Sequence, residues 1–285
     1  MSRALAGLLK RLREGVPRRL LRARKHIWQR RHLDRNAIKT PVWVVGCHRS
    51  GTSMMIRTIT RCPMARVYDE NSHASSLDYR LRSDSVLARL IRKSYAPVVV
   101  FKPICDAHLT DRLLERHPNS RALWPFRRYE DVANSAVRKW KGHQKDIMKW
   151  IRDRDWSQLG WRGERLSPAL IDLITRLYRE DMTHEEGAAL QWYLRNTFYF
   201  DLGLDQDHRV RLVRYEDLVS KPLESFERVF AFMGCPFDPR YVDDVFATSI
   251  KKAPFPSIDP EIRSLCDGMA ARLEEANSAQ DAAKL

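Results

Sequence analysis

Residues 41–53 read PVWVVGCHRSGTS, and this stretch decides the fold class. Its first half is apolar without alternation, which is typical of a parallel strand covered on both faces. Its second half is a short glycine loop, and a helical pattern follows. A strand, a glycine loop and a helix N-terminus together form an anion cradle, because backbone N–H groups and the helix dipole both favour negative charge there. The stretch therefore predicts an anion-binding loop at the edge of a parallel sheet.

The rest of the chain repeats this alternation of short apolar strands and longer helical patterns. Further strand candidates are residues 98–102, 121–126 and 210–213. Strands that alternate with helices predict an α/β fold of three layers, with a parallel central sheet and helices on both faces. The helical patterns cover residues 75–94, 110–117, 129–140, 183–199 and 221–233.

Two of the expected helices carry start signals. Ser167 is a candidate N-cap, and Pro168 after it suits the first helical position. Thr183 and Glu186 have the spacing of a capping box, in which each side chain binds the other residue's backbone N–H.

Length and composition favour one large domain inside the cell. The 285 residues are 44% hydrophobic, enough for a substantial core. No apolar run approaches the roughly 18 to 20 residues that span a bilayer. Arginines interrupt the N-terminal region, so it lacks the apolar core of a signal peptide. The cysteines are odd in number and show neither CxxC nor Cys/His metal spacing, which predicts reduced thiols and no zinc site. They are Cys47, Cys62, Cys105, Cys235 and Cys266.

Positive charge is concentrated at the N-terminus. The chain has a net charge of +15, and residues 1–39 hold thirteen Lys/Arg against two acidic residues. This asymmetry predicts a basic arm, residues 1–39, on a nearly neutral body, residues 40–285, and it does not indicate a nucleic-acid-binding protein. The arm has an apolar helical stripe, Leu5, Leu8, Leu9, Leu12 and Val16, and a second basic stretch with Leu20, Leu21, Ile27 and Trp28.

Such an arm has three interpretations. Residues 1–35 can lie on an anionic lipid surface, as basic amphipathic helices do. They can instead pack on the body or on a second subunit, or form a disordered or nucleic-acid-binding arm. We expect a cytoplasmic protein that is, at most, peripheral at the inner face of the membrane.

The glycine loop differs at one position from the loop that binds nucleoside triphosphates. The spacing of Gly46 and Gly51 matches GxxxxGK[ST], but Thr52 stands where that motif has lysine. The lysine serves the β/γ-phosphates, so the loop is poorly suited to ATP or GTP. A basic side chain occurs three places earlier, at Arg49. The alternative is an ordinary strand-to-helix turn.

Two more segments follow predicted strands. Residues 127–135 read RRYEDVANS, with Arg127 at the strand end and Ser135 eight positions later. A strand-end arginine offers a bidentate charged fork, and a serine on the following helix adds a hydroxyl. Residues 212–218 read LVRYEDL. Taken singly, each pattern is weak; together with the loop they form an ordered set.

These three segments resemble the signatures of sulfotransferases. Residues 48–53, HRSGTS, are similar to the family's 5′-phosphosulfate loop, and residues 127–135 are similar to its 3′-phosphate motif, R-x-P-x-D-x-x-x-S. The YEDL segment matches the family's third motif, and the set spans residues 42–222. His48 and Tyr129 replace family prolines. Met54 stands where cytosolic mammalian members have an adenine-stacking tryptophan, so adenine must be held differently.

The resemblance implies a donor, an acceptor and a set of binding residues. The donor would be 3′-phosphoadenylyl sulfate, used without a metal. The acceptor would be a hydroxyl or amine of a carbohydrate, lipid or small molecule. The donor-binding residues would be His48, Arg49, Ser50, Gly51, Thr52, Ser53, Arg127, Ser135 and, near the adenine, Tyr215.

The resemblance also assigns catalytic roles. Arg49 takes the position of the family's catalytic Lys or Arg. Lys102 is similar to the lysine of the KTH segment in cytosolic members, although it can be an ordinary strand-end lysine. The histidine of that segment is Ile104 here. Glu70 lies 21 residues after Arg49, as a glutamate does in the tyrosylprotein branch, and is the expected general base.

Other readings of the base and of the acceptor region stay open. Asp69 precedes Glu70, and such a carboxylate pair can raise one pKa; both can also be solvated loop residues. His73 is a weaker candidate for the base. Four tryptophans follow within residues 138–161, among seven Lys/Arg, and they either cover the acceptor or belong to an amphipathic helix. These are Trp140, Trp150, Trp156 and Trp161.

Two other function classes compete with the sulfotransferase reading. A P-loop kinase or NTPase requires lysine at position 52 and a carboxylate for Mg²⁺, and the lysine is absent. A basic membrane- or nucleic-acid-associated binding protein on a degenerate P-loop fold would lack the loop arginine or the base, and Arg49 and Glu70 are both present.

Overall fold

Five strands form a parallel sheet within the part of the chain that the computed structural model describes, residues 23–246 and 254–282. The order is β2-β5-β1-β6-β7, and each neighbouring pair is parallel. The sheet confirms the predicted α/β class. Its strands are β1 (Thr40–Val44), β2 (Ala65–Tyr68), β5 (Val98–Phe101), β6 (Arg121–Phe126) and β7 (Val210–Arg214).

The central strand β1 is buried on both faces. Trp43 lies opposite Phe101 of β5 and Ala122 of β6. Because successive side chains point to opposite faces of a strand, Trp43 belongs to one hydrophobic core, whereas Val42 and Val44 belong to the other. Burial on both sides explains why the sequence of this strand is apolar without alternation.

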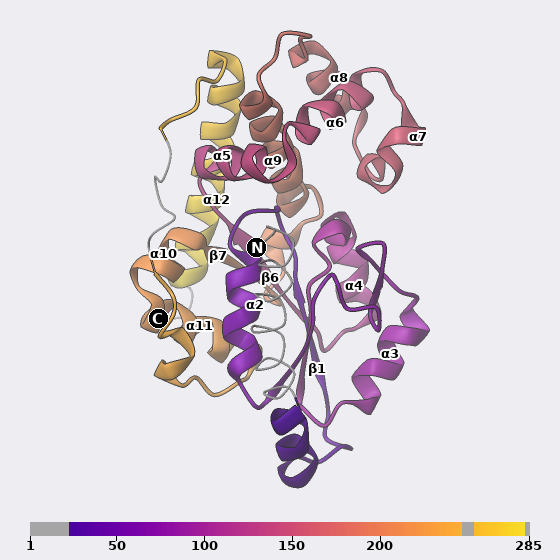
Figure 1. The fold of residues 1–285 in the computed structure, drawn as a ribbon, viewed down its shortest axis with the longest axis vertical. Helices are drawn as coiled ribbons and strands as arrows, with labels where there is room; N and C mark the ends of the chain where they lie inside the picture. The colour runs from indigo at the N-terminus through magenta and orange to yellow at the C-terminus, as the bar shows by residue number, and fades with distance from the viewer. Residues whose placement is uncertain (1–22, 247–253, 283–285) are drawn as a thin grey trace, which may run out of the picture.

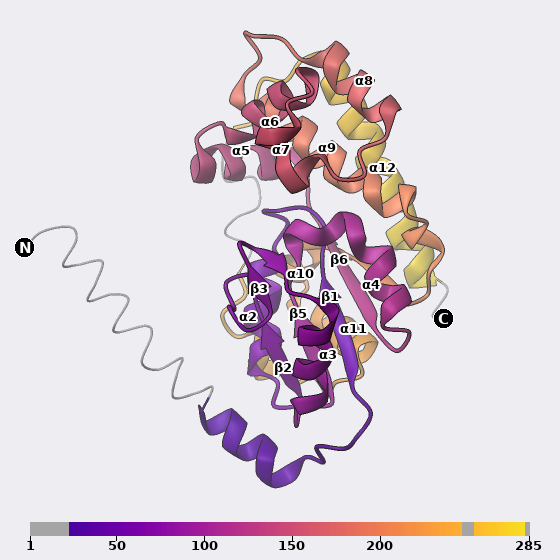
Figure 2. The ribbon, with the colours of Figure 1, turned by 90° about the vertical axis from the view of Figure 1, so that its right-hand side faces the viewer.

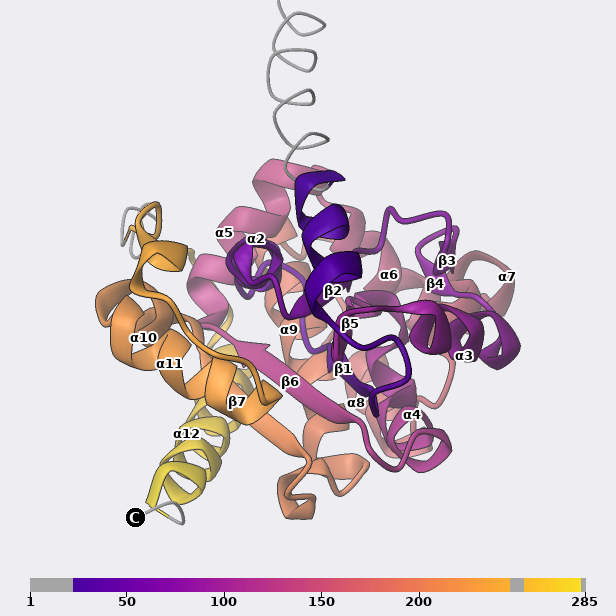
Figure 3. The same cartoon turned by 90° about the horizontal axis from the view of Figure 1, so that it is seen from below.

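Helices cover both faces of the sheet, so the three predicted layers are confirmed (Figures 1 and 3). One face is covered by α2 (Thr52–Arg61), α10 (Tyr215–Ser220) and α11 (Pro222–Met233). The other face is covered by α3 (Asp84–Lys93), α4 (Thr110–Arg116), α9 (His184–Asp201) and α12 (Pro260–Ala282).

A helical layer lies above the carboxyl ends of the strands. Figure 2 shows these helices stacked over the sheet, with the long α12 running alongside both parts. This arrangement places the loops that follow the strands beneath a helical roof. The roof contains α5 (Tyr129–Trp140), α6 (His143–Arg152), α7 (Trp156–Leu159) and α8 (Pro168–Leu177), together with α9. Short 3-10 helices are η1 (Ile104–Leu109), η2 (Gly160–Gly163), η3 (Leu204–Gln206) and η4 (Pro239–Val242).

The predicted helix over residues 75–94 was wrong in its first half. Residues 76–81 form a small antiparallel hairpin, β3 (Ser76–Leu77) with β4 (Arg80–Leu81), and the helix α3 begins only at Asp84. Asp78 and Tyr79 form the turn with positive φ angles of 49° and 65°, which a helix does not allow. The apolar side chains that completed the helical pattern are solvent-exposed there.

Both predicted helix starts are confirmed. The Ser167 side chain accepts a hydrogen bond from the backbone N–H of Leu170. Thr183 and Glu186 form the complete capping box, with both reciprocal hydrogen bonds present. These bonds fix where α8 and α9 begin. The five cysteines are all buried and free, as expected for reduced thiols.

The predicted apolar stripe of residues 5–16 lies outside the described residues, as do Leu20 and Leu21. Residues 23–32 are helical and pack on the body. Lys25 Nζ donates to the carbonyl of Thr60 at 2.7 Å, and Gln29 Nε2 donates to the carbonyl of Pro63 at 2.7 Å. Ile27 and Trp28 point to solvent instead. Among the described helices, none has the length and apolar character to cross a membrane.

Candidate active site

A cavity of about 510 Å³ lies where the loops after the strands meet the helical roof. Its floor comes from the loop after β1 and from the residues that follow β5. Its walls come from α5, α6, α9 and η2. Ligands of open α/β sheets bind outside the carboxyl ends of the strands, where the chain crosses in opposite directions from a central strand. The cavity lies at this position, beside β1.

The glycine loop after β1 adopts backbone conformations that only a few residue types accept. Gly46 and Gly51 have φ angles of 92° and 88°, and Arg49 between them has 68°. A Cβ atom on Gly51 would lie 2.3 Å from the ring of Tyr215. The loop therefore turns sharply into α2 with the tyrosine ring packed directly against it, which explains why glycine is required at position 51.

Three residues from distant segments meet beside this loop. Arg49 Nε donates to Ser135 Oγ at 2.9 Å, and Arg127 Nη1 donates to the carbonyl of Arg49 at 3.4 Å. Burial, and after it the neighbouring charge of Arg127, lowers the pKa of Arg49. Two guanidinium groups and a hydroxyl gathered at a helix N-terminus suit a ligand rich in phosphate. The structure thus brings together the residues that the two sequence motifs indicated.

Tyr215 supports this cluster from behind. Its side chain is buried, with 5% of its surface exposed, and its ring lies against Gly51. The guanidinium carbon of Arg127 lies 4.3 Å from the ring centroid, a cation–π contact. The structure places this tyrosine as packing for the loop and for Arg127, with little ring surface left for stacking on an adenine.

Lys102, Glu70 and Ser53 form a second polar group on the cavity floor. Lys102 Nζ donates to Glu70 Oε1 at 2.7 Å and to Ser53 Oγ at 2.9 Å. Lys102 is only 5% exposed, so its ammonium is held in place by these two contacts. Glu70 also lines the cavity. The position after β5 therefore carries an anchored cation directly beside a carboxylate.

The other base candidates are placed differently. The Asp69 carboxylate accepts the backbone N–H of Asn71 at 3.1 Å, so Asp69 stabilises the turn, and Glu70 is paired with Lys102 instead. His73 is exposed and does not line the cavity. The geometry favours Glu70 over both.

His48 lies in the cavity floor as a neutral imidazole. Burial lowers its pKa to about 3, and the positive charges of Arg195 and Lys102 add to this effect. Its ring stands edge-on to Trp140 at a centroid distance of 5.6 Å. Its Nε2 lies 3.8 Å from the sulfur of Cys105. At neutral pH this residue can shape the cavity and form a hydrogen bond, but it adds no positive charge for a phosphate.

The cavity also contains polar residues that the sequence did not single out. Arg195 of α9 is 2% exposed, and Arg162 of η2 lines the same cavity. Gln144 of α6 and Gln191 of α9 also line the cavity, and their side-chain amide oxygens are buried. Arg195 had a detectable signal, because it lies three residues after Trp192 and three before Phe198, both buried apolar residues of the same helix. The other three had none.

The four tryptophans of the region 138–161 divide between two roles. Trp140 and Trp161 line the cavity. Trp150 packs against the hydrophobic core, and Trp156 is largely exposed. Within the described residues, no cluster of three or more His, Cys, Asp or Glu side chains suits a metal ion.

Comparison with known proteins identifies the domain type. Residues 39–254 match the family model described as the sulfotransferase domain. A search of the curated proteins found no match.

A search of the solved structures found matches of low sequence identity. A sulfotransferase from Alicyclobacillus acidocaldarius is 20% identical over 86% of this chain and 100% of its own, with a TM-score of 0.48. The sulfotransferase domain from the curacin biosynthetic pathway is 16% identical over 83% of this chain and 98% of its own, with a TM-score of 0.49. A mouse sulfotransferase in complex with PAP is 11% identical over 88% of this chain and 91% of its own, with a TM-score of 0.44. Likeness at this level does not identify a donor or an acceptor.

Proposed function

Because this chain belongs to the sulfotransferase domain family, we propose that it transfers a sulfuryl group from 3′-phosphoadenylyl sulfate to an acceptor hydroxyl. The observation that carries the proposal is the cluster of Arg49, Ser135 and Arg127 at the glycine loop. Three segments that are far apart in the sequence meet there. The acceptor belongs to the carbohydrates, lipids or small molecules that carry such a hydroxyl.

The loop and the two arginines fit a donor with phosphates at both its 5′ and 3′ positions. The residues 46–53 supply backbone N–H groups at the N-terminus of α2, where a 5′-phosphosulfate would be neutralised. Arg127 and Ser135 would hold the 3′-phosphate. The absence of lysine at position 52 separates this loop from those that serve a nucleoside triphosphate.

Three side chains perform the chemistry in this proposal. The acceptor oxygen forms a bond to sulfur while the bond between sulfur and the bridging oxygen of the donor breaks. Arg49 and Lys102 stabilise the negative charge that develops on the departing oxygen. Glu70 takes the acceptor proton as general base. Because Lys102 holds Glu70 at 2.7 Å, the base and the cation are positioned together.

The proposal assigns the reaction to residues 40–285 and requires no metal, since the loop and the arginines neutralise the bisphosphate product. Binding of residues 1–35 to an anionic membrane surface is a separate proposal that rests only on the basic composition of the arm. An alternative, a basic binding protein without catalysis, shares the fold but predicts no transfer.

The donor assignment is tested by nucleotide binding. We expect 3′-phosphoadenosine 5′-phosphate to raise the melting temperature, because a ligand at a hundredfold excess over its Kd adds about 2.7 kcal/mol of stability. AMP, which lacks the 3′-phosphate, should have a much smaller effect. Arg127→Ala should remove most of the difference between the two nucleotides.

Arg128→Ala provides the matched control. Arg128 is adjacent in sequence, but its guanidinium pairs with Glu130 at 3.2 Å and is not part of the cluster. Equal stabilisation by both nucleotides in the unaltered protein would refute the 3′-phosphate assignment. Transfer of labelled sulfate in the presence of EDTA, across a panel of acceptors, then separates an enzyme from a binding protein.

A further inference from the structure

The cavity lining carries more positive charge than the donor cluster uses. In the described part of the chain, one carboxylate, that of Glu70, lines the cavity, and it is already paired with Lys102. Five cationic side chains line the same space. They are Arg49, Lys102, Lys139, Arg162 and Arg195.

Arg195 is the most unusual of these cations. It is 2% exposed, and its Nη2 donates to the carbonyl of Ile104 at 3.0 Å. Its Nε has no hydrogen-bond partner among the described residues. Burial lowers the pKa of this guanidinium. A buried cation without a counter-charge is costly, and such groups are normally paired.

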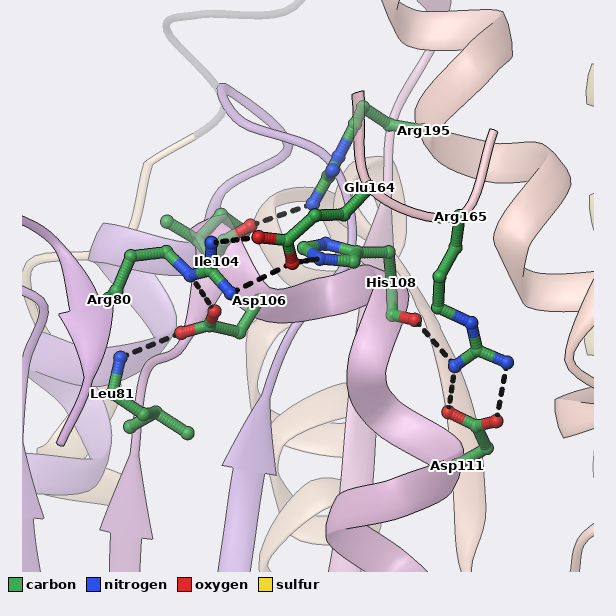
Figure 4. A network of polar contacts seen from close by, with 9 residues as sticks. All are labelled: Arg80, Leu81, Ile104, Asp106, His108, Asp111, Glu164, Arg165 and Arg195. Carbon is green, nitrogen blue, oxygen red and sulfur yellow. Dashed lines mark hydrogen bonds and ion pairs between the residues drawn. The ribbon is translucent and has the colours of Figure 1, made fainter. Parts of the chain in front are cut away.

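The nearby carboxylates are engaged elsewhere, as Figure 4 shows. The carboxylate of Asp106 accepts hydrogen bonds from Arg80 Nε and from the backbone N–H of Leu81. The Glu164 carboxylate accepts hydrogen bonds from both terminal nitrogens of Arg80 at 3.0 Å. Its Oε2 also lies 2.8 Å from His108 Nε2. Neither forms an ion pair with Arg195 or Arg162 within the described residues.

The remaining lining indicates a hydroxylated ring beside this charge. The side-chain amide oxygens of Gln144 and Gln191 are buried and have no donor among the described residues. Hydroxyl groups of a ligand would supply such donors. Trp140 and Trp161 add aromatic side chains to the cavity lining, and the guanidinium of Arg162 lies 4.6 Å from the ring centroid of Trp161.

From these observations we infer that the acceptor is itself an anion: a hydroxylated ring compound that carries a carboxylate, sulfate or phosphate group. Arg195 and Arg162 bind the anionic group, and the glutamine oxygens accept hydrogen bonds from ring hydroxyls. That this anion is the sulfuryl acceptor rests on the proposed function. The anionic subsite itself depends only on Arg195 and Arg162, which form no ion pair within residues 23–246 and 254–282.

Binding to the protein saturated with 3′-phosphoadenosine 5′-phosphate tests the inference without turnover. The probes are two matched pairs: 4-hydroxybenzoate against 4-hydroxybenzamide, and glucuronate against glucose. The nucleotide occupies the donor cluster, so a second anion reports on the remaining cations. We expect each anionic member to bind at least about tenfold more tightly than its neutral partner, the usual gain from a charged hydrogen bond.

Arg195→Met and Arg162→Met should each reduce this preference toward unity while keeping the nucleotide-induced rise in melting temperature. Because Arg162 is only half-buried, Arg162→Met should fold and report on the anion preference even if Arg195→Met does not fold. Arg89→Met removes an exposed charge on α3, outside the cavity, and should leave the preference unchanged.

Three results would overturn the inference: equal affinity within each pair, no binding of either anionic probe at millimolar concentration, or a preference that persists in both variants. A protein that does not bind the nucleotide would refute the proposed donor instead. The same titrations without nucleotide, in the unaltered protein and in both variants, would still report on the anionic subsite.

Discussion

The donor side and the roof side of the cavity differ in how their polar groups are satisfied. On the donor side the groups bind one another: Arg49 donates to Ser135, Arg127 donates to the Arg49 carbonyl, and Lys102 bridges Glu70 and Ser53. On the roof side the Nε of Arg195 and the amide oxygens of two glutamines have no protein partner among the described residues.

This difference shows two ways to build a binding surface. The donor side holds its cations in fixed positions before any ligand arrives, which is how charge developing in a transition state is best stabilised. The roof side leaves its hydrogen-bonding capacity for the ligand, which favours selection between acceptors. Variants on the donor side should therefore change turnover, whereas variants of the roof should change which acceptor is used.

Glu70→Gln should give the largest effect. The substitution keeps the size of the side chain but removes the proposed base, so turnover should fall by roughly 10²–10⁴. Affinity for the product nucleotide should barely change, because the group faces the acceptor. Steady-state turnover with chemistry shown to be rate-limiting is the measurement.

Asp69→Asn is the control for this variant, because Asp69 stabilises the adjoining turn and does not contact Lys102. An acceptor with an acidic hydroxyl, such as a nitrophenol, should partly rescue Glu70→Gln. Near-normal turnover of Glu70→Gln would show that Glu70 is not the base. The donor side would then not contain all the groups that determine turnover.

Arg49→Ala should reduce turnover by about 10²–10³, the usual result of deleting one preorganised donor. The acceptor KM should stay close to its original value, since this arginine belongs to the donor side. Arg57→Ala is the matched control, an exposed arginine on α2, the helix that follows the loop of Arg49. A variant whose main defect is acceptor affinity would show that the two sides are not separate.

The donor side could be predicted from the sequence because its residues follow strand ends. Arg127 and Tyr215 come directly after β6 and β7, Arg49 lies in the loop that follows β1, and the carboxyl ends of parallel strands meet at one edge. The roof side could not be predicted in this way. Its glutamines and Arg162 lie on helices and a 3-10 turn whose relative positions depend on tertiary packing.

The errors have similar causes. The pattern over residues 75–94 has helical periodicity, but Leu77 and Tyr79 are exposed in a hairpin, so periodicity alone misassigned them. The edge strand β2 has four residues and no flanking signal, and it was not predicted. That Tyr215 lies near the adenine, as the resemblance implies, stays a prediction; the packing of its ring against Gly51 is a contact that the sequence did not indicate.

Gly51→Ala should lower both stability and nucleotide affinity. A left-handed backbone costs a non-glycine residue about 1–2 kcal/mol. The added methyl would also displace the ring of Tyr215. Overpacking of this kind typically lowers stability by about a further 1–3 kcal/mol. Urea unfolding with and without 3′-phosphoadenosine 5′-phosphate measures both effects.

Gly203→Ala separates these two contributions. Gly203 also has a positive φ angle, 65°, but an added Cβ would meet nothing within 4 Å. We therefore expect only the backbone cost there and an unchanged nucleotide affinity. Equal losses in the two variants would mean that Tyr215 does not support the loop.

The smallest effect should be a loss of stability at low pH, and it should arise at His108 of η1. Burial lowers the pKa of His108 to about 4, more than its hydrogen bond to Glu164 raises it. Between pH 6.5, the ordinary value, and about 4, the unfolded chain therefore binds more protons than the folded protein. Stability is fully present above pH 6.5 and is lost as the pH falls toward 4.

From pH 7.5 to pH 5 this group should cost up to about 2 kcal/mol, at 1.36 kcal/mol for each pH unit below its unfolded pKa. Other histidines with a lowered pKa, such as His48, act in the same direction, so the comparison is with His108→Gln across the same pH range. The variant should lose less stability on acidification than the unaltered protein.

Because Glu164, the partner of His108, lies two residues after Arg162, acid should also weaken binding of anionic acceptors before it weakens nucleotide binding. Parallel loss of both affinities would show that the two sides of the cavity unfold as one unit.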